Sequence, residues 1–279
     1  MLLFDFNNVA LSTIMYNHSR DNRSIELDMM RGLIIARLLR MRDSIGTKFN
    51  ELPVLALDSR VGYWRRDVFP HYKASRKKGR DSSSFDYDKF FANLNIITEE
   101  FKHFMPFVVL QIDKIEADDI IAVLSRYVRS ENHIILSEDK DLQQLCNANV
   151  IQYKPSTMAK MKTDYSLLEH IMSGDRGDGV PNIFSPNNAL VEGIRQTAFT
   201  KKLKEQYLKY NLNDILDYLD AEYHTRYQEN NILINLEMIP NKLIRLIINE
   251  YEIAKTNTST TSLMDYLFEH KITRLVTDR

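Results

Sequence analysis

The sequence has little cysteine, glycine or proline, and it has no long apolar run. The single cysteine, Cys146, excludes a disulfide framework and a zinc site built on several thiolates, and it suits a reducing compartment. Eight glycines and seven prolines in 279 residues predict few tight loops. No apolar run approaches the ~18 residues of a membrane span. We therefore expect no membrane association.

The overall charge does not indicate a partner. The chain carries 37 basic and 38 acidic residues, so its net charge alone predicts no nucleic-acid binding. It begins Met-Leu-Leu-Phe-Asp, and an acid at position 5 interrupts any apolar leader. We therefore expect no signal peptide, and we expect the protein to be cytoplasmic.

Short apolar segments alternate with helical patterns through the first half of the chain. Strands are predicted at residues 2–4, 53–57, 108–112, 133–136 and 150–153. This alternation predicts an α/β fold, with a mostly parallel central sheet and helices on both of its faces.

Strand signals fade beyond about residue 185. Helices are predicted at 195–210, 213–227 and 241–254. We therefore expect an α/β core at residues 1–185, followed by a helical C-terminal region at 186–279.

Acidic residues directly follow four of the five predicted strands. They are Asp5, Asp58, the cluster Glu116, Asp118 and Asp119, and then Asp139 with Asp141. The carboxyl ends of parallel strands form the ligand crevice of an open sheet. We expect these acids to meet there, joined by Asp175 and Asp178 from a loop. Any single acid would be an ordinary turn former or helix cap, but four acidic strand ends are hard to produce by chance.

So many neighbouring carboxylates predict a metal site. They cannot all be ionised unless cations neutralise them. Oxygen ligands without cysteine or histidine favour Mg²⁺ or Mn²⁺ over zinc. Two such ions ~4 Å apart activate a water and stabilise both the attacking and the leaving oxygen of a phosphodiester. We predict two Mg²⁺ ions, for which Mn²⁺ substitutes.

Residues 60–80 carry eight basic side chains and one acid, a local charge of +7. Aromatic residues alternate with the cations, a pattern typical of a channel for single-stranded nucleic acid. A solvated loop is the alternative, and Tyr63 and Trp64 could be ordinary core residues. The candidate nucleic-acid-binding residues are Arg60, Trp64, Arg65, Arg66, Tyr72, Lys77, Lys78 and Arg80.

These motifs appear in the order seen in the 5′ nuclease (flap endonuclease) superfamily, which the chain resembles. The segment from Pro70 to Arg76 resembles the base of that family's helical arch. The part from Tyr227 to Tyr251 is similar to the phage ribonuclease H members of T-even type, which remove RNA primers and flaps.

The resemblance implies a PIN-like core with an arch insertion at about 60–105, in which residues 77–100 form the arch itself. It implies that Asp119 does not contact a metal ion but supports the residues that do. It also implies that Lys73 and Arg76 contact the scissile phosphate and that Tyr72 lies near the terminal bases. The implied first-ion ligands are Asp5, Asp58, Glu116 and Asp118, and the implied second-ion ligands, partly through water, are Asp139, Asp141, Asp175 and Asp178.

The implied activity is that of a 5′→3′ exonuclease and flap endonuclease, which cleaves DNA and RNA–DNA hybrid during replication. We expect a monomer, which would act in the host cytoplasm if the protein is of phage origin. A replication clamp and a single-strand-binding protein are partners expected from the family alone. The sequence lacks the family's Gly-x-Gly hairpin after Pro181. Lys201, Lys202 and Lys204 are candidates for gripping duplex, although a solvated helix face suits them better.

Three other functions remain open from the residues. A single-strand ribonuclease of PIN type shares the acidic core, but it lacks the long insertion. A catalytically silent nucleic-acid-binding homologue should have lost an acid or Lys73, and none is missing. A phosphotransfer receiver domain needs neither Asp175 and Asp178 nor the basic stretch.

Overall fold

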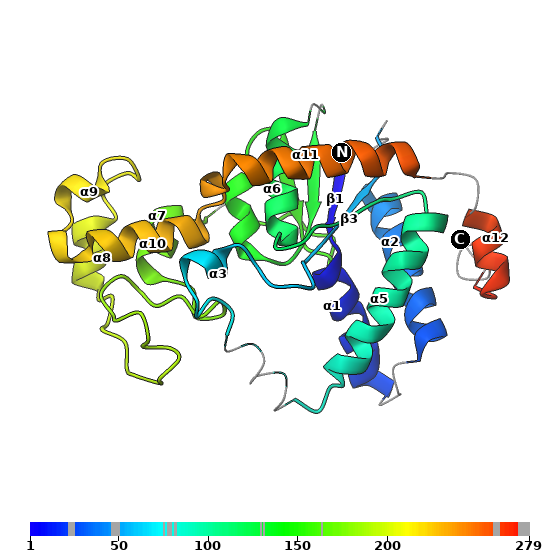
Figure 1. Ribbon diagram of the computed structural model, residues 1–279, viewed down its shortest axis with the longest axis horizontal. Helices are drawn as coiled ribbons and strands as arrows, with labels where there is room; N and C mark the ends of the chain where they lie inside the picture. The colour runs from blue at the N-terminus through cyan, green and yellow to red at the C-terminus, as the bar shows by residue number, and fades with distance from the viewer. Residues whose placement is uncertain are drawn as a thin grey trace. The chain divides into compact units, whose positions relative to one another are not determined.

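A computed structural model describes residues 1–21, 26–45, 51–74, 76, 80, 83–128, 130, 132–162, 164–258 and 263–272 (Figure 1). The chain forms two compact units, and each unit is assembled from segments that are distant in sequence. Unit 1 comprises residues 1–60, 84–163 and 242–279, and unit 2 comprises residues 61–83 and 164–241.

A five-stranded parallel sheet lies at the centre of unit 1, in the order β3-β2-β1-β4-β5. Its strands are β1 (Leu2–Asp5), β2 (Val54–Leu57), β3 (Val108–Gln111), β4 (His133–Leu136) and β5 (Val150–Tyr153). All five predicted strands are present, so the predicted α/β fold is confirmed. In the register, Asp5 pairs with Ala56 and Phe4 with Leu136, so the residues that follow β1, β2 and β4 emerge at one edge.

Helices of unit 1 cover this sheet (Figure 1). Leu2 and Phe4 of β1 share a buried cluster with Ile34 and Phe101, and α6 contacts β1 and β2. The helices are α1 (Phe6–Asp21), α2 (Leu27–Ile45), α5 (Tyr87–Phe104), α6 (Ala117–Tyr127), α11 (Asn241–Asn257), α12 (Leu263–Glu269) and the short 3-10 helix η1 (Lys140–Leu145).

Helix α5 occupies the C-terminal part of the predicted arch insertion. The Asp86 carboxylate caps it by accepting a 2.9 Å hydrogen bond from the N–H of Lys89. Its apolar stripe, which includes Leu94 and Ile97, is buried in the core of unit 1. Helix α5 therefore packs on the core of unit 1, and the arch at residues 77–100 stays a prediction.

Unit 2 is helical. Its elements are α3 (Arg65–Val68), α7 (Leu167–Ser173), α8 (Lys201–Tyr207), α9 (Ile215–Tyr218), η2 (Ala221–Tyr223), α10 (His224–Ile234) and η3 (Leu236–Met238). Phe69 and Tyr72 share its buried cluster with Ile171 and Tyr227. This packing assigns residues 61–83 to unit 2, although the sequence analysis placed them within the α/β core.

The two units do not follow the predicted boundary at residue 185. Helix α11 belongs almost entirely to unit 1, and α7 packs with α10 in unit 2. The helices predicted at 195–210 and 213–227 are also shorter and broken. The side chain of Asn211 accepts hydrogen bonds from the N–H groups of Asn213 (3.0 Å) and Asp214 (3.1 Å), which forms a turn between α8 and α9. None of the described helices is both long and apolar enough to cross a membrane.

Candidate active site

Asp5 ends strand β1 at the carboxyl edge of the sheet. Its Oδ2 accepts a 2.7 Å hydrogen bond from the hydroxyl of Ser137, and its Oδ1 accepts one of 3.2 Å from the N–H of Asn8. Ser137 directly follows β4, the neighbour of β1. The two strand ends are therefore joined by a buried side-chain contact.

Asp58 follows strand β2 and is held against the start of helix α6. Its Oδ1 accepts a 3.0 Å hydrogen bond from the N–H of Ala117, the first residue of that helix. Its backbone oxygen accepts a 3.0 Å bond from the side chain of Gln111, at the end of β3. Two neighbouring strands and a helix thus fix this carboxylate.

The three acids at the start of α6 have different environments. Asp119 is 1% exposed, and its Oδ2 accepts a 3.2 Å hydrogen bond from the N–H of Glu116, which forms a capping box at the helix N-terminus. Glu116 is equally buried, whereas Asp118 is half-buried. Asp119 therefore orders the helix that carries Glu116 and Asp118.

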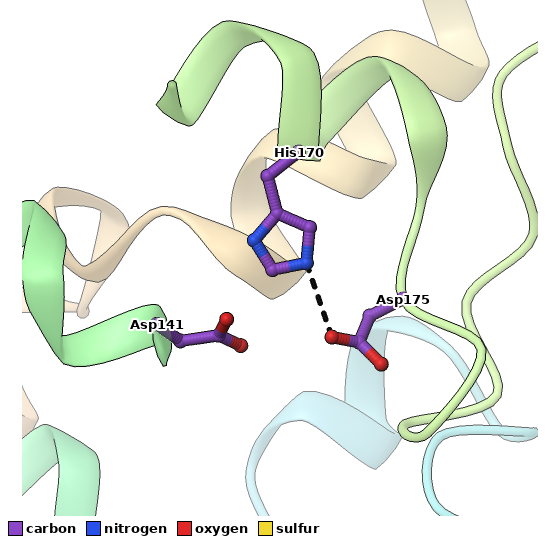
Figure 2. A group of neighbouring side chains, drawn as sticks. All are labelled: Asp141, His170 and Asp175. Carbon is purple, nitrogen blue, oxygen red and sulfur yellow. Dashed lines mark hydrogen bonds and ion pairs between the residues drawn. The ribbon is translucent and has the colours of Figure 1, made fainter. Parts of the chain in front are cut away.

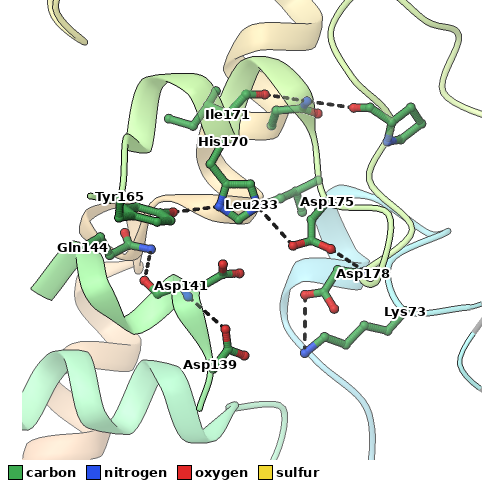
Figure 3. Close-up of polar contacts among 12 residues, drawn as sticks. Lys73, Asp139, Asp141, Gln144, Tyr165, His170, Ile171, Asp175, Asp178 and Leu233 are labelled. Atoms are coloured by element: carbon green, nitrogen blue, oxygen red, sulfur yellow. Dashed lines mark hydrogen bonds and ion pairs between the residues drawn. The ribbon is translucent and has the colours of Figure 1, made fainter. Parts of the chain in front are cut away.

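Asp139 follows strand β4 and caps η1. Its Oδ1 accepts a 2.9 Å hydrogen bond from the N–H of Asp141, as Figure 3 shows. Its own N–H donates to the Ser137 hydroxyl at 3.0 Å, and its backbone oxygen accepts from Gln152 at 2.6 Å. Ser137 therefore contacts both Asp5 and Asp139, a role that the sequence motif did not reveal.

The carboxylates at this edge repel one another. Burial and the negative charge of Asp58 raise the pKa of Asp5 to about 7, and Asp139 acts in the same direction. The hydrogen bonds from Ser137 and Asn8 oppose the shift without cancelling it. An all-oxygen set of crowded carboxylates fits a hard divalent cation such as Mg²⁺ or Mn²⁺.

The loop after α7 carries the two acids of unit 2, Asp175 and Asp178. Gly174 ends the helix with φ +67°, and a Cβ at this position would lie 2.4 Å from the backbone oxygens of Val180 and Pro181. Only glycine fits this turn. The Oδ1 of Asp175 then accepts a 3.0 Å hydrogen bond from the N–H of Asp178.

A histidine contacts the first of these acids. Figure 2 shows the ring of His170 directed at Asp175, with 3.0 Å between Nε2 and Oδ2. On the other side of the ring, Nδ1 lies 2.7 Å from the hydroxyl of Tyr165. The acidic motifs of the sequence contain no histidine, so the sequence did not predict this contact. The only sequence signal is a histidine five residues before an acid.

Asp178 binds the basic segment of unit 2. Its Oδ2 accepts a 2.9 Å hydrogen bond from the hydroxyl of Tyr72. The same oxygen lies 3.6 Å from Nζ of Lys73, a contact that Figure 3 shows. Its Oδ1 pairs with the guanidinium of Arg76. The N–H of Lys73, in the left-handed region with φ +55°, donates to the backbone oxygen of Asp178 at 2.7 Å. The predicted residues Tyr72, Lys73 and Arg76 therefore surround one predicted metal ligand.

The ammonium of Lys73 is enclosed by aromatic rings. It lies 5.1 Å from the ring centroid of Tyr63 and 5.2 Å from that of Tyr72, within cation–π range. The side chain is 6% exposed. The cation is therefore fixed in place beside Asp178.

The other predicted nucleic-acid contacts divide by exposure. Trp64 and Arg65 are buried, and Nε of Arg65 donates a 2.8 Å hydrogen bond to the backbone oxygen of Leu233. These two residues stabilise unit 2, so any effect on nucleic acid is indirect. Arg60, Arg66 and Arg80 are exposed, and Nη2 of Arg60 pairs with Glu99 at 3.2 Å. Lys77 and Lys78 lie outside the described residues.

The segment after Pro181 is ordered by Asn182 rather than by a Gly-x-Gly hairpin. The Asn182 side chain accepts a 2.8 Å hydrogen bond from the Ser185 hydroxyl and donates one of 2.8 Å to the backbone oxygen of Thr197. Lys204 pairs with Glu169 at 2.6 Å, and Lys201 lies 3.8 Å from Glu205. Lys202 is exposed. A role of these lysines in duplex binding stays a prediction.

Comparison with protein families covers nearly the whole chain. Residues 20–173 match the model of the 5′-3′ exonuclease N-terminal resolvase-like domain. Residues 162–278 match the model of the C-terminal region of T4 ribonuclease H. Ribonuclease H of Enterobacteria phage T4 is 31% identical over 261 residues, which are 89% of this chain and 85% of that protein.

Solved structures share the fold. The T5 D15 protein crystallised with metal ions superimposes with a TM-score of 0.61 at 14% identity, over 91% of this chain and 98% of that one. The bacteriophage T5 D15 flap endonuclease in a complex with DNA and metal ions gives a TM-score of 0.62 at 14% identity, with the same coverage of 91% and 98%.

Proposed function

The chain belongs to the 5′-3′ exonuclease family, with a C-terminal region of T4 ribonuclease H type, and we propose that it is a divalent-metal-dependent, structure-specific 5′ nuclease. Its proposed reaction is hydrolysis of phosphodiesters at 5′ ends, flaps and RNA primers. The observation that carries the proposal is the crowding of Asp5, Asp58 and Asp139 at one sheet edge. Family membership disfavours a PIN-type ribonuclease and a receiver domain.

Metal binding is supported by the donor set of this chain. Asp5, Asp58, Glu116 and Asp118 are the proposed ligands of one ion. Asp139 and Asp141, with Asp175 and Asp178, are the proposed ligands of the second, partly through water. Bound divalent ions would lower the pKa of a water and stabilise the negative charge that develops on the phosphate.

The chain's own cations have a separate proposed role. Lys73 and Arg76 contact the scissile phosphate, because both already lie beside Asp178, a proposed metal ligand. Lys73 is held by two rings and by its backbone bond to Asp178, so little side-chain freedom is lost when a phosphate binds. Its charge is therefore directed at the reacting phosphate.

Exposed arginines hold the rest of the polyanion. Arg60, Arg66 and Arg80 are proposed to bind backbone phosphates, because the carboxylates alone would repel the substrate. The DNA in the complex of the T5 flap endonuclease and the name of the T4 relative support DNA and RNA–DNA hybrid as substrates.

Cleavage of end-labelled flap, nicked duplex and RNA–DNA hybrid, with Mg²⁺ and with EDTA, tests this function. We expect cutting near the free 5′ end, a 5′-phosphate and a 3′-hydroxyl on the products, and no reaction in EDTA. Binding without cleavage in Mg²⁺ would identify a catalytically silent homologue instead. Cleavage in EDTA would contradict the metal requirement.

A further inference from the structure

Asp175 is fixed by two hydrogen bonds, one to each carboxylate oxygen. Oδ1 accepts from the N–H of Asp178, and Oδ2 accepts from Nε2 of His170. A carboxylate oxygen has two lone pairs, so it can accept a hydrogen bond and bind a cation at the same time. The two bonds therefore orient the group and are compatible with metal binding.

His170 is itself fixed by Tyr165. A carboxylate without a proton only accepts, so the bond to Asp175 makes Nε2 the donor. The Tyr165 hydroxyl, 2.7 Å from Nδ1, can then donate to the unprotonated ring nitrogen. One neutral tautomer of His170 satisfies both contacts, and the ring is only 7% exposed.

The helix geometry makes this arrangement rigid. His170 lies in α7, and Gly174 turns the chain so that Asp175 follows the helix directly. A backbone bond of 2.7 Å from Val180 to the oxygen of Asp175 closes the loop. The side-chain amide of Asn230, which is fully buried, donates hydrogen bonds to the backbone oxygens of Ile171, before the loop, and Pro181, after it.

We propose that His170, held by Tyr165, is a positioning residue that orients the Asp175 carboxylate for the second metal ion. The inference rests on the proposed function, because it takes Asp175 as a metal ligand. Partners that orient a ligand carboxylate or imidazole typically change metal affinity by about 10–100-fold. The expected role is metal affinity rather than chemistry.

Calorimetric titration of the full chain with Mn²⁺ alone, without nucleic acid, tests this inference. In His170→Phe, we expect the affinity of one of two sites to fall by about 10-fold or more, with the other site unchanged. In His170→Gln, the amide is expected to donate to Asp175 and to restore much of the affinity. In Tyr165→Phe, which removes only a hydroxyl, we expect a smaller decrease at the same site.

Tyr227→Phe is the matched control, because its buried hydroxyl has no hydrogen-bond partner among the described residues. Its Mn²⁺ affinity should equal that of the wild type. Cleavage provides a second measurement: in His170→Phe, the Mg²⁺ concentration for half-maximal rate should rise, while the rate at saturating Mg²⁺ recovers. A merely structural role would lower the rate at every Mg²⁺ concentration.

The outcomes separate this inference from the proposed function. If wild-type protein does not bind Mn²⁺, the proposed function fails. If it binds and both His170→Phe and Tyr165→Phe bind equally well, only the positioning role of His170 is overturned. If His170→Gln loses as much affinity as His170→Phe, the positioning role is also overturned, because a direct ligand would behave in that way.

Discussion

The hydroxyl of Ser137 donates a 2.7 Å hydrogen bond to Oδ2 of Asp5, a residue 132 positions earlier in the chain. The contact exists because β1 and β4 are neighbours in the parallel sheet. Ser137 also accepts from the N–H of Asp139, so one hydroxyl links two acidic strand ends. The crowded carboxylates therefore lie at and just after the ends of paired strands.

Replacing Asp118 tests the first metal ion. We expect Asp118→Asn to slow cleavage by about a thousandfold, because losing several kcal/mol of transition-state stabilisation has that effect on a rate. The more drastic changes Asp118→Ala and Asp139→Ala should abolish cleavage, while the protein remains folded. Single-turnover rates with saturating Mg²⁺ measure this effect.

Asp113→Asn is the matched control for Asp118→Asn, since Asp113 is exposed and lies between strand β3 and helix α6. Its rate should equal that of the wild type. Full activity in Asp118→Asn would remove this residue from the metal site.

Replacing Asp5 tests whether the carboxylates repel one another without metal. Because the pKa of Asp5 is raised to about 7, the test is made above pH 7, where its carboxyl is ionised. There we expect Asp5→Asn to raise the melting temperature in EDTA, because a buried charge next to Asp58 and Asp139 is removed while an oxygen remains for Ser137. A gain of about 1 kcal/mol corresponds to roughly 2–4 °C for a chain of this size. Mg²⁺ should stabilise the wild type and have less effect on the variant.

Thermal melts with EDTA and with Mg²⁺ measure both effects. Asp113→Asn is again the control and should melt with the wild type. A lower melting temperature for Asp5→Asn in EDTA would show that the carboxylate stabilises the apoprotein.

Lys73→Ala tests the cation beside Asp178. We expect the single-turnover rate to fall by about a hundredfold or more, a loss of roughly 3 kcal/mol of transition-state stabilisation, while substrate affinity changes by a few fold. Lys242 is exposed near the start of helix α11, and the control Lys242→Ala should cleave at the wild-type rate. An unchanged rate combined with weaker binding would assign Lys73 to substrate binding only.

Two adjacent arginines are expected to behave in opposite ways. Arg66 is exposed, so Arg66→Ala should weaken the dependence of flap binding on salt. The slope of the logarithm of the binding constant against the logarithm of the salt concentration should become less steep by about 0.7–0.9. Arg65 is buried and bonds to Leu233, so Arg65→Met should lower the melting temperature and leave the slope unchanged. Binding titrations in EDTA at several salt concentrations distinguish the two, and an equal change of slope in both would contradict the assignment.

The sequence predicted the strands and the acids that follow them, because a short apolar run with an acid at its end is a local pattern. Asp5, Asp58 and Asp139 emerge at one edge once the strands pair in parallel. The sequence could not predict that Ser137 links two of them, since that contact depends on strand order.

Other features depend on packing that no local pattern records. Arg65 and Arg66 are identical residues in one basic stretch, and only the orientation of α3 buries the first and exposes the second. His170 contacts Asp175 only because Gly174 takes a left-handed turn after α7. The boundary near residue 185 also differs from the compact units, because Phe69 and Tyr72 pack with helices far along the chain.

Cleavage of a single flap substrate shows whether this chain is the metal-dependent 5′ nuclease that we propose. A flap duplex labelled at its 3′ end is incubated with wild-type protein and with Asp118→Asn, over a range of Mg²⁺ concentrations and in EDTA. We expect the wild type to cut near the base of the 5′ flap with a rate that rises with Mg²⁺. We expect no product in EDTA, and we expect Asp118→Asn to cut about a thousandfold more slowly. Cleavage that is independent of Mg²⁺ would rule out a metal-dependent nuclease, and cleavage that is equally fast in Asp118→Asn would rule out a metal site that includes Asp118.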